Sequence, residues 1–214
     1  MNLNDHANAG GSDAVAEIRR LVAEGANVNG PKEHQACGQK PLHMASLRGH
    51  TDVVEVLISL GANVNVVNDF YESPLRCAAS HRRTQIVRML IHAGADVNAG
   101  LPLSEAAVNG DVQSMEALLE AGAVIEARNS SRMRSTALHQ AADGGCFDAV
   151  RLLVCAGADI ARRSTCGGSA LLFACKQKHR DVANYLLSAG AEACARNENG
   201  DSPAMFAAFH GLVD

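Results

Sequence analysis

The chain has 214 residues, of which 47% are hydrophobic and 20% charged, and its formal net charge at pH 7 is -4. This composition is typical of a soluble globular protein, and the acidic balance argues against general nucleic-acid binding, which requires clustered excess Lys and Arg. No apolar stretch approaches the roughly 20 residues that a membrane-spanning helix needs, so we expect a cytoplasmic or nuclear protein without membrane association.

The first eleven residues are rich in Asn, Gly and Asp and contain no apolar segment typical of a signal peptide. We expect residues 1–8 to form a flexible tail and residues 9–214 to form a single domain. The seven cysteines include no Cys-x-x-Cys pair, which argues against the usual zinc and thioredoxin-like sites. We therefore expect no metal, no cofactor and free thiols in a reducing compartment.

Two short signatures recur along the remainder of the chain. The dipeptide Gly-Ala begins at residues 25, 61, 94, 122, 157 and 190, at intervals of 36, 33, 28, 35 and 33 residues. A Pro-Leu or Ala-Leu pair begins at residues 41, 74, 102, 137 and 170, and Pro-Ala takes its place at 203. Two signatures in constant register indicate internal repeats. We expect these repeats at residues 9–34, 35–67, 68–99, 100–128, 129–163, 164–196 and 197–214, the last of them incomplete.

Each repeat has the pattern of a helix, a tight turn, a second helix and a loop. Ser73 is a preferred N-cap residue, and Pro74 follows at the first helical position, where proline costs no hydrogen bond. In the second helix Val53 and Leu57 belong to an apolar stripe at helical spacing, and Gly61 ends that helix. Second helices are expected to begin near residues 51, 83, 111, 147 and 180. The predicted fold is therefore an all-α solenoid of about six and a half helix-turn-helix repeats.

The sequence Lys-Pro-Leu-His-Met-Ala at residues 40–45 resembles the Thr-Pro-Leu-His-x-Ala signature of the ankyrin repeat, whose period of about 33 residues also matches. The resemblance covers residues 9–214 and implies β-hairpin fingers between repeats, with fingers and first helices forming a concave face. It implies a non-catalytic, monomeric module that binds a partner protein or peptide on that face.

Two other functions remain as alternatives. The chain is either the substrate-recognition domain of a larger enzyme or ubiquitin-ligase subunit, or a solute-binding regulatory domain that uses a basic surface. The first alternative places the effector region after residue 214, since the seventh repeat stops early in its second helix. No catalytic grouping of Ser, His, Cys or paired carboxylates recurs at one place, so we do not expect an enzyme.

The finger after Gly61 departs from the ankyrin pattern in its aromatic residues. It carries Asp69, Phe70, Tyr71 and Glu72, with Tyr71 where the family normally has glycine. Adjacent aromatic side chains on a loop are typical of interface anchors. The alternative is that one ring folds back onto the adjacent finger.

The following loop is shorter and lacks a finger. Ala99-Gly100 runs directly into Leu101-Pro102, which explains the short interval of 28 residues. We interpret this gap either as neutral drift or as a shape that a partner requires.

Charge is distributed unevenly along the chain. Residues 1–122 have a net charge of -5, whereas residues 123–200 have a net charge of +3. The basic residues of the second half predict an acidic or phosphorylated partner segment, the alternative being an ordinary solvated edge. This basic cluster consists of Arg128, Arg132, Arg134, Arg162, Arg163, Lys176 and Lys178. The complete set of predicted partner-binding residues is Arg48, Asp69, Phe70, Tyr71, Glu72, His81, Arg82, Arg132, Arg134, Arg163, Lys176 and Lys178.

The family resemblance assigns roles to two further residue types. His43 and His139 occupy the signature position at which the imidazole ties adjacent loops by hydrogen bonds. Asn29, Asn65 and Asn98 occupy the loop position that is hydroxylated in some ankyrin proteins, and they are candidate hydroxylation sites. Their alternative role is to close the loop.

Overall fold

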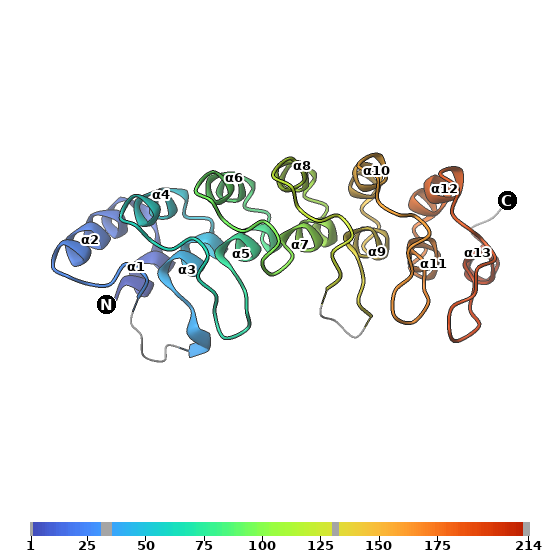
Figure 1. Ribbon diagram of the computed structural model, residues 1–214, viewed down its shortest axis with the longest axis horizontal. Coiled ribbons are helices and arrows are strands. Elements are labelled where there is room, and N and C mark those ends of the chain that lie inside the picture. Colours follow the sequence, from blue (N-terminus) through green and yellow to red (C-terminus); the bar gives the residue numbers. More distant parts are fainter. Residues whose placement is uncertain (1, 31–35, 130–132, 212–214) are drawn as a thin grey trace. The chain divides into compact units, whose positions relative to one another are not determined.

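The computed structural model describes residues 2–30, 36–129 and 133–211, and within them it contains thirteen α-helices. The chain divides into two compact units, Met1–Pro102 and Leu103–Asp214. In each unit the helices alternate between a row of first helices and a row of second helices (Figure 1). The prediction of an all-α repeat fold is confirmed, whereas the single domain expected over residues 9–214 is represented by two units.

In the first unit the first helices α1, α3 and α5 pack side by side, and α4 packs between α2 and α6. The bounds are α1 (Leu3–Ala9), α2 (Gly11–Ala23), α3 (Pro41–Arg48), α4 (Thr51–Ser59), α5 (Pro74–Ser80) and α6 (Thr84–His92). In the second unit α11 packs between α9 and α13, and α10 packs between α8 and α12. The bounds are α7 (Pro102–Asn109), α8 (Val112–Glu120), α9 (Ala137–Asp143), α10 (Phe147–Cys155), α11 (Ala170–Lys176), α12 (Arg180–Ser188) and α13 (Pro203–His210).

The helix ends follow the capping residues of the sequence. The side chains of Ser73, Ser169 and Ser202 each accept the backbone N–H three residues later, and α5 and α13 place proline in their first turn. The second helices begin at residues 51, 84, 112, 147 and 180, within one residue of expectation. Their apolar stripe is buried, since Val53 and Leu57 have no exposed surface.

The prediction of a flexible tail over residues 1–8 is wrong, because helix α1 (Leu3–Ala9) begins within this segment. Asn2 caps α1 in a capping box with Asp5, an arrangement that satisfies two free donors at once. Leu3 and Ala7 are buried, and α1 packs against α3. The first repeat is therefore a complete helix pair that begins at Leu3 rather than near residue 9. The composition of this segment suggested disorder, although Asn2-x-x-Asp5 and the i, i+4 pair Leu3 and Ala7 already carried the signal.

The fingers are tight turns with little regular strand. Figure 1 shows them projecting on the side of the first helices in each unit. The fingers at residues 68–72, 129–135, 164–168 and 197–201 are each closed by a backbone hydrogen bond, such as Ser164 N–H to the Gly168 carbonyl at 2.9 Å. Among the described residues the isolated bridges comprise one pair, Arg163 and Ser169.

Two buried histidines join a first helix to the next finger. His43 accepts the backbone N–H three residues earlier at Nδ1 (3.2 Å) and donates from Nε2 to the Glu72 carbonyl (2.8 Å). His139 makes the same two bonds, the second to the Gly168 carbonyl at 3.2 Å. Both arrangements need a neutral imidazole with its proton on Nε2. Burial lowers the pKa of both His43 and His139 below 6.5, and this desolvation is the largest cause of each shift.

Two further histidines tie the second-helix starts to the preceding repeat. His50 donates from Nε2 to the Asn8 carbonyl at 3.1 Å, and His179 donates to the Asp143 carbonyl at 3.0 Å. These bonds fix the turn between the two helices of a repeat against its neighbour. Hydrogen bonds from histidine side chains to the backbone therefore join neighbouring repeats both at the fingers and at the turns between the two helices of a repeat.

We predict that the protein loses stability below about pH 6.5, because the unfolded chain protonates both imidazoles there while the fold keeps His43 and His139 neutral. The stability that the two neutral imidazoles contribute is fully present above pH 6.5. It is lost as the pH falls toward the lowered pKa values that the two groups have in the folded protein. Each histidine can add a slope of up to about 1.4 kcal/mol per pH unit. Urea unfolding at pH 7.5, 6.5 and 5.5 measures how the free energy of unfolding changes with pH.

The double variant His43→Gln/His139→Gln should be less stable than the wild type at pH 7.5 and should show a flatter pH dependence. The matched control is His92→Gln, because His92 is exposed. An equal slope in the wild type and the double variant would contradict the assignment.

Candidate protein-interaction surface

The aromatic finger comprises residues 68–73 of the first unit, and the buried Asn68 fixes its shape. The side-chain oxygen of Asn68 accepts the N–H groups of Phe70 and Glu72, both at 2.9 Å. Its backbone N–H donates to the Glu72 carbonyl at 3.1 Å. The two rings at the tip point away from this network, with Phe70 61% and Tyr71 80% exposed. This exposure favours the interpretation as interface anchors over a ring that packs on the adjacent finger.

Tyr71 occupies a backbone conformation that normally requires glycine. Its φ is 59°, and the equivalent finger residues Gly38, Gly167 and Gly200 also have positive φ. Arg134, at the same position of another finger, has a φ of 46°. Non-glycine residues in this region cost of order 1 kcal/mol. Both side chains are exposed, so the fold gains little from them in return.

The turn between first and second helices shows the same exchange of residues. Gly49, Gly110 and Gly145 have positive φ at this turn, whereas Arg82 (55°) and Lys178 (68°) take the equivalent position elsewhere. Both cations are exposed. Four of the predicted partner-binding residues, namely Tyr71, Arg82, Arg134 and Lys178, thus occupy positions where glycine would cost less.

The acidic residues of the aromatic finger are engaged within the chain. The Glu72 carboxylate accepts a hydrogen bond from the Asn68 side chain (2.8 Å) and lies 3.9 Å from the Arg76 guanidinium. Asp69 donates its backbone N–H to the Cys37 carbonyl of the preceding finger at 3.2 Å. These contacts make both residues supports of the finger, and the aromatic rings are its outermost groups.

Two more predicted contact residues of the first unit have partners within the chain. Arg48 donates from Nε to the Asn8 side chain at 2.8 Å, which links α3 to the end of α1. His81 lies at the end of α5, where its Nδ1 is 2.9 Å from the Ser80 hydroxyl and 3.1 Å from the Cys77 carbonyl. Both remain exposed at their other atoms.

The basic cluster of the second unit is partly neutralised. Arg162 lies 3.6 Å from the Glu126 carboxylate. Arg163 lies 3.9 Å from Glu192 and donates to the Gly167 and Arg196 carbonyls, both at 3.0 Å. Arg128 also bonds a neighbouring finger, through the Arg163 carbonyl at 3.0 Å. Within the described residues Arg134, Lys176 and Lys178 are exposed and make no ion pair, and Arg132 lies outside the described residues.

The candidate hydroxylation sites hold the loops of neighbouring repeats together. The side-chain oxygen of Asn29 accepts the N–H of Asn63 at 2.8 Å. Asn65 likewise accepts the N–H of Asp96 at 2.8 Å and donates to the Gly94 carbonyl at 3.2 Å. The N–H of Asn98 donates to the Asp96 side chain at 2.9 Å. Loop closure accounts for Asn29 and Asn65, and hydroxylation stays a prediction.

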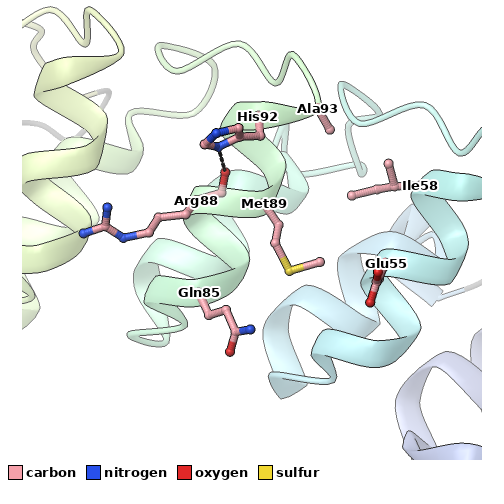
Figure 2. Close-up of a pocket in the computed structure, with 7 residues that line it drawn as sticks. All are labelled: Glu55, Ile58, Gln85, Arg88, Met89, His92 and Ala93. Carbon is pink, nitrogen blue, oxygen red and sulfur yellow. Dashed lines mark hydrogen bonds between the residues drawn. The ribbon is translucent and has the colours of Figure 1, made fainter.

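A shallow groove between α4 and α6 was not anticipated from the sequence. It has a volume of about 460 Å³ and a mainly apolar lining that includes Ile58, Met89 and Ala93. Figure 2 shows Ile58 and Met89 facing each other across it, with Glu55 on the same helix as Ile58 and the Arg88 guanidinium pointing away from the groove. Ile58 follows Leu57 of the apolar stripe directly, but it is only half-buried and lines the groove.

Within residues 2–30, 36–129 and 133–211 no group of three or more His, Cys, Asp or Glu side chains could hold a metal ion. No helix in the described part of the chain is both long and apolar enough to cross a membrane.

Comparison with known protein families identifies the repeats. Models described as ankyrin repeats match residues 6–100 and 138–187, which together exceed half of the chain. The fold agrees with solved ankyrin repeat structures. The human ASB11 ankyrin repeat domain superposes with a TM-score of 0.83 at 27% identity, covering 95% of this chain and 90% of that one. The Bcl-3 ankyrin repeat domain gives 0.79 at 24% identity, with coverages of 96% and 93%, and shows the fold alone.

The curated relatives differ in what surrounds the repeats. Human protein phosphatase 1 regulatory subunit 27 is 45% identical over 67 residues, covering 31% of this chain and 44% of that protein. Human ankyrin repeat and SOCS box protein 16 is 31% identical over 201 residues, with coverages of 90% and 37%. The Caenorhabditis elegans ankyrin repeat and KH domain-containing protein mask-1 is 33% identical over 203 residues, with coverages of 94% and 8%. The chain spans less than half the length of these relatives.

We predict that Tyr71→Gly stabilises the protein by up to about 1 kcal/mol, since glycine relieves the left-handed backbone and the ring loses few contacts. Arg134→Gly should do the same. The control Gly167→Ala should act in the opposite direction, because a Cβ there would lie 3.2 Å from the Glu198 backbone nitrogen. Chemical denaturation measures all three. A loss of stability in Tyr71→Gly would show that the ring supports the fold.

Proposed function

The chain belongs to the ankyrin repeat family, and we propose that it is a non-catalytic module that binds a partner protein through its fingers and first helices. The observation that carries this proposal is the pair of exposed rings, Phe70 and Tyr71, on a finger that the buried Asn68 holds rigid. Aromatic side chains that are fixed before binding lose little entropy in a complex and dominate the energy of many interfaces.

The polar surroundings suit such a role. Asn68 and Arg76 engage the Glu72 carboxylate, so the finger presents its apolar groups without an unpaired buried charge beside them. The backbone N–H groups of Phe70, Tyr71 and Glu72 are already hydrogen-bonded, and the rings can therefore be covered without leaving these donors unsatisfied.

We predict that Phe70→Ala/Tyr71→Ala abolishes capture of the partner by the immobilised chain. Loss of a hot-spot side chain costs about 2 kcal/mol or more, which corresponds to a roughly 30-fold or larger loss of affinity. The measurement is affinity capture, followed by titration of the captured protein against purified wild type and variant. Val124→Ala is the matched control, since Val124 is an exposed apolar residue (53%) of the other unit. Equal affinity of the double variant and the wild type would remove the anchor role.

The second unit contributes a basic surface to the same proposal. Arg134, Lys176 and Lys178 are exposed, and within the described residues they have no acidic partner. Arg134 and Lys178 also hold left-handed backbone positions at which glycine is the cheaper residue. We infer that these three cations receive an acidic or phosphorylated segment of the partner, through charge-assisted hydrogen bonds.

We predict that Arg134→Glu/Lys178→Glu weakens partner binding at least tenfold in 50 mM salt and by a smaller factor in 500 mM salt, because salt screens exposed charges. Fluorescence anisotropy with a labelled partner measures both values. The control Arg151→Glu changes an exposed arginine that is paired with Asp148 on α10, and it should leave the affinity unchanged. If the two charge-reversal variants behave alike, the basic surface does not contact the partner.

A further inference from the structure

Adjacent fingers are joined by a backbone hydrogen bond at a constant position. The donor is the N–H of the fifth residue before the next first helix, and the acceptor is the carbonyl of the fourth residue before the preceding one. The three bonds are Asp69 to Cys37 (3.2 Å), Thr165 to Met133 (2.8 Å) and Glu198 to Cys166 (3.1 Å). Stacking of one finger on the next therefore uses the same donor and acceptor in both units.

The aromatic finger has this acceptor but no following finger to supply the donor. Phe70 is the fourth residue before α5 and is equivalent to Cys37 and Cys166. The next loop turns directly into the following helix, with the N–H of Leu101 donating to the Asn98 carbonyl at 3.3 Å. Within the described part of the chain the Phe70 carbonyl accepts no hydrogen bond.

The loop that replaces the missing finger contacts residues at the start of α5. The Ser73 hydroxyl donates to the Ala99 carbonyl at 3.1 Å, and the stem of Arg76 lies against Gly100, where an added Cβ would be 2.9 Å from the Arg76 Cδ. The edge therefore consists of a backbone acceptor and two exposed rings, and the short loop at residues 99–101 contacts the same finger and α5 through Ser73 and Arg76.

The other fingers show what covers an edge of this kind. An added Cβ on Gly167 would lie 3.2 Å from the Glu198 nitrogen, and one on Gly38 would lie within 2.4 Å of the Asp69 side chain. In both cases the neighbouring finger sits against the left-handed residue. Tyr71 holds that position with 80% of its surface exposed, and the loop that follows in this unit, residues 95–101, contains no finger.

We propose that a turn of a partner protein takes the place of the missing finger. A backbone N–H of that turn donates to the Phe70 carbonyl, and an apolar side chain of the turn packs on Phe70 and Tyr71. The ion pair between Glu72 and Arg76 keeps these two charges engaged with each other, so the edge offers a partner segment mainly the Phe70 carbonyl and the two rings. This inference rests on the proposed interaction function and specifies the partner segment that the aromatic finger binds.

The test uses a finger-filled variant in which residues 99–101 are replaced by a copy of residues 195–202. The graft adds the five residues that the interval lacks. The probe is a phage-displayed library of twelve-residue peptides selected on the full wild-type chain. We expect the enriched peptides to bind the finger-filled variant and Phe70→Ala at least tenfold more weakly than the wild type, with Val124→Ala as the unchanged control.

An amide-to-ester scan of the tightest peptide tests the hydrogen bond itself. An ester removes the N–H donor, and one position of the scan should weaken binding about fivefold, the effect of one net hydrogen bond. That loss should be absent on the finger-filled variant. If the finger-filled variant fails to fold, the ester scan and Phe70→Ala still decide the question.

Other results overturn the inference in distinguishable ways. Peptides that need Phe70 and Tyr71 but bind the finger-filled variant equally well refute the missing-finger site and leave the proposed function standing. Peptides indifferent to every change, or no enrichment at all, count against the site. A dimer of the wild-type chain that the graft dissociates would make a second copy, and not a partner, the occupant.

Discussion

Helices of seven to nine residues do not persist alone in water, so each repeat depends on the bonds that join it to the next. In this protein those bonds run mainly from side chains to the backbone. His43 and His139 tie a first helix to the following finger, and Asn29 and Asn65 tie one loop to the next. His50 and His179 tie the turns between helices. A core of Ala, Val and Leu does little to determine by shape how one repeat is positioned on the next. Directional hydrogen bonds between the repeats determine this position instead.

Because the repeats depend on these bonds, surface side chains that form them can be distinguished from surface side chains that are available to bind a partner. Arg163 and Arg48 stand on the surface, yet each is bonded to a neighbouring repeat, and the Glu72 carboxylate is bonded within its own finger. Tyr71, Arg134 and Lys178 are exposed in backbone positions that the stack fills more cheaply with glycine. Residues that cost stability and make no tie are better candidates for binding than residues selected by charge or location alone.

The sequence predicted what is encoded locally. Ser73 and Pro74 set the start of α5, and the repeated Gly-Ala set the helix ends, because capping acts within one turn. The sequence reading missed α1, since composition was given more weight than the cap at Asn2. It also could not separate Glu72 from Phe70 within one finger, because their roles depend on Asn68 and Arg76 folding against them. The groove at Ile58 and Met89 arises between two helices, and no spacing within one helix reveals it.

The aromatic finger combines a rigid tip with an incomplete neighbourhood. Asn68 fixes the backbone of the tip through two hydrogen bonds of 2.9 Å, so the backbone that carries the two rings loses little freedom when a partner covers them. In most of the chain such rigidity serves the stacking of one finger on another. Next to Ala99 and Gly100 the unit provides no following finger to stack, so the Phe70 carbonyl and the two rings have no such contact within the unit. A contact from a molecule outside the unit would give this ordered tip a role. The conserved geometry of the other three finger pairs defines the form of that contact, a backbone donor beside an apolar group.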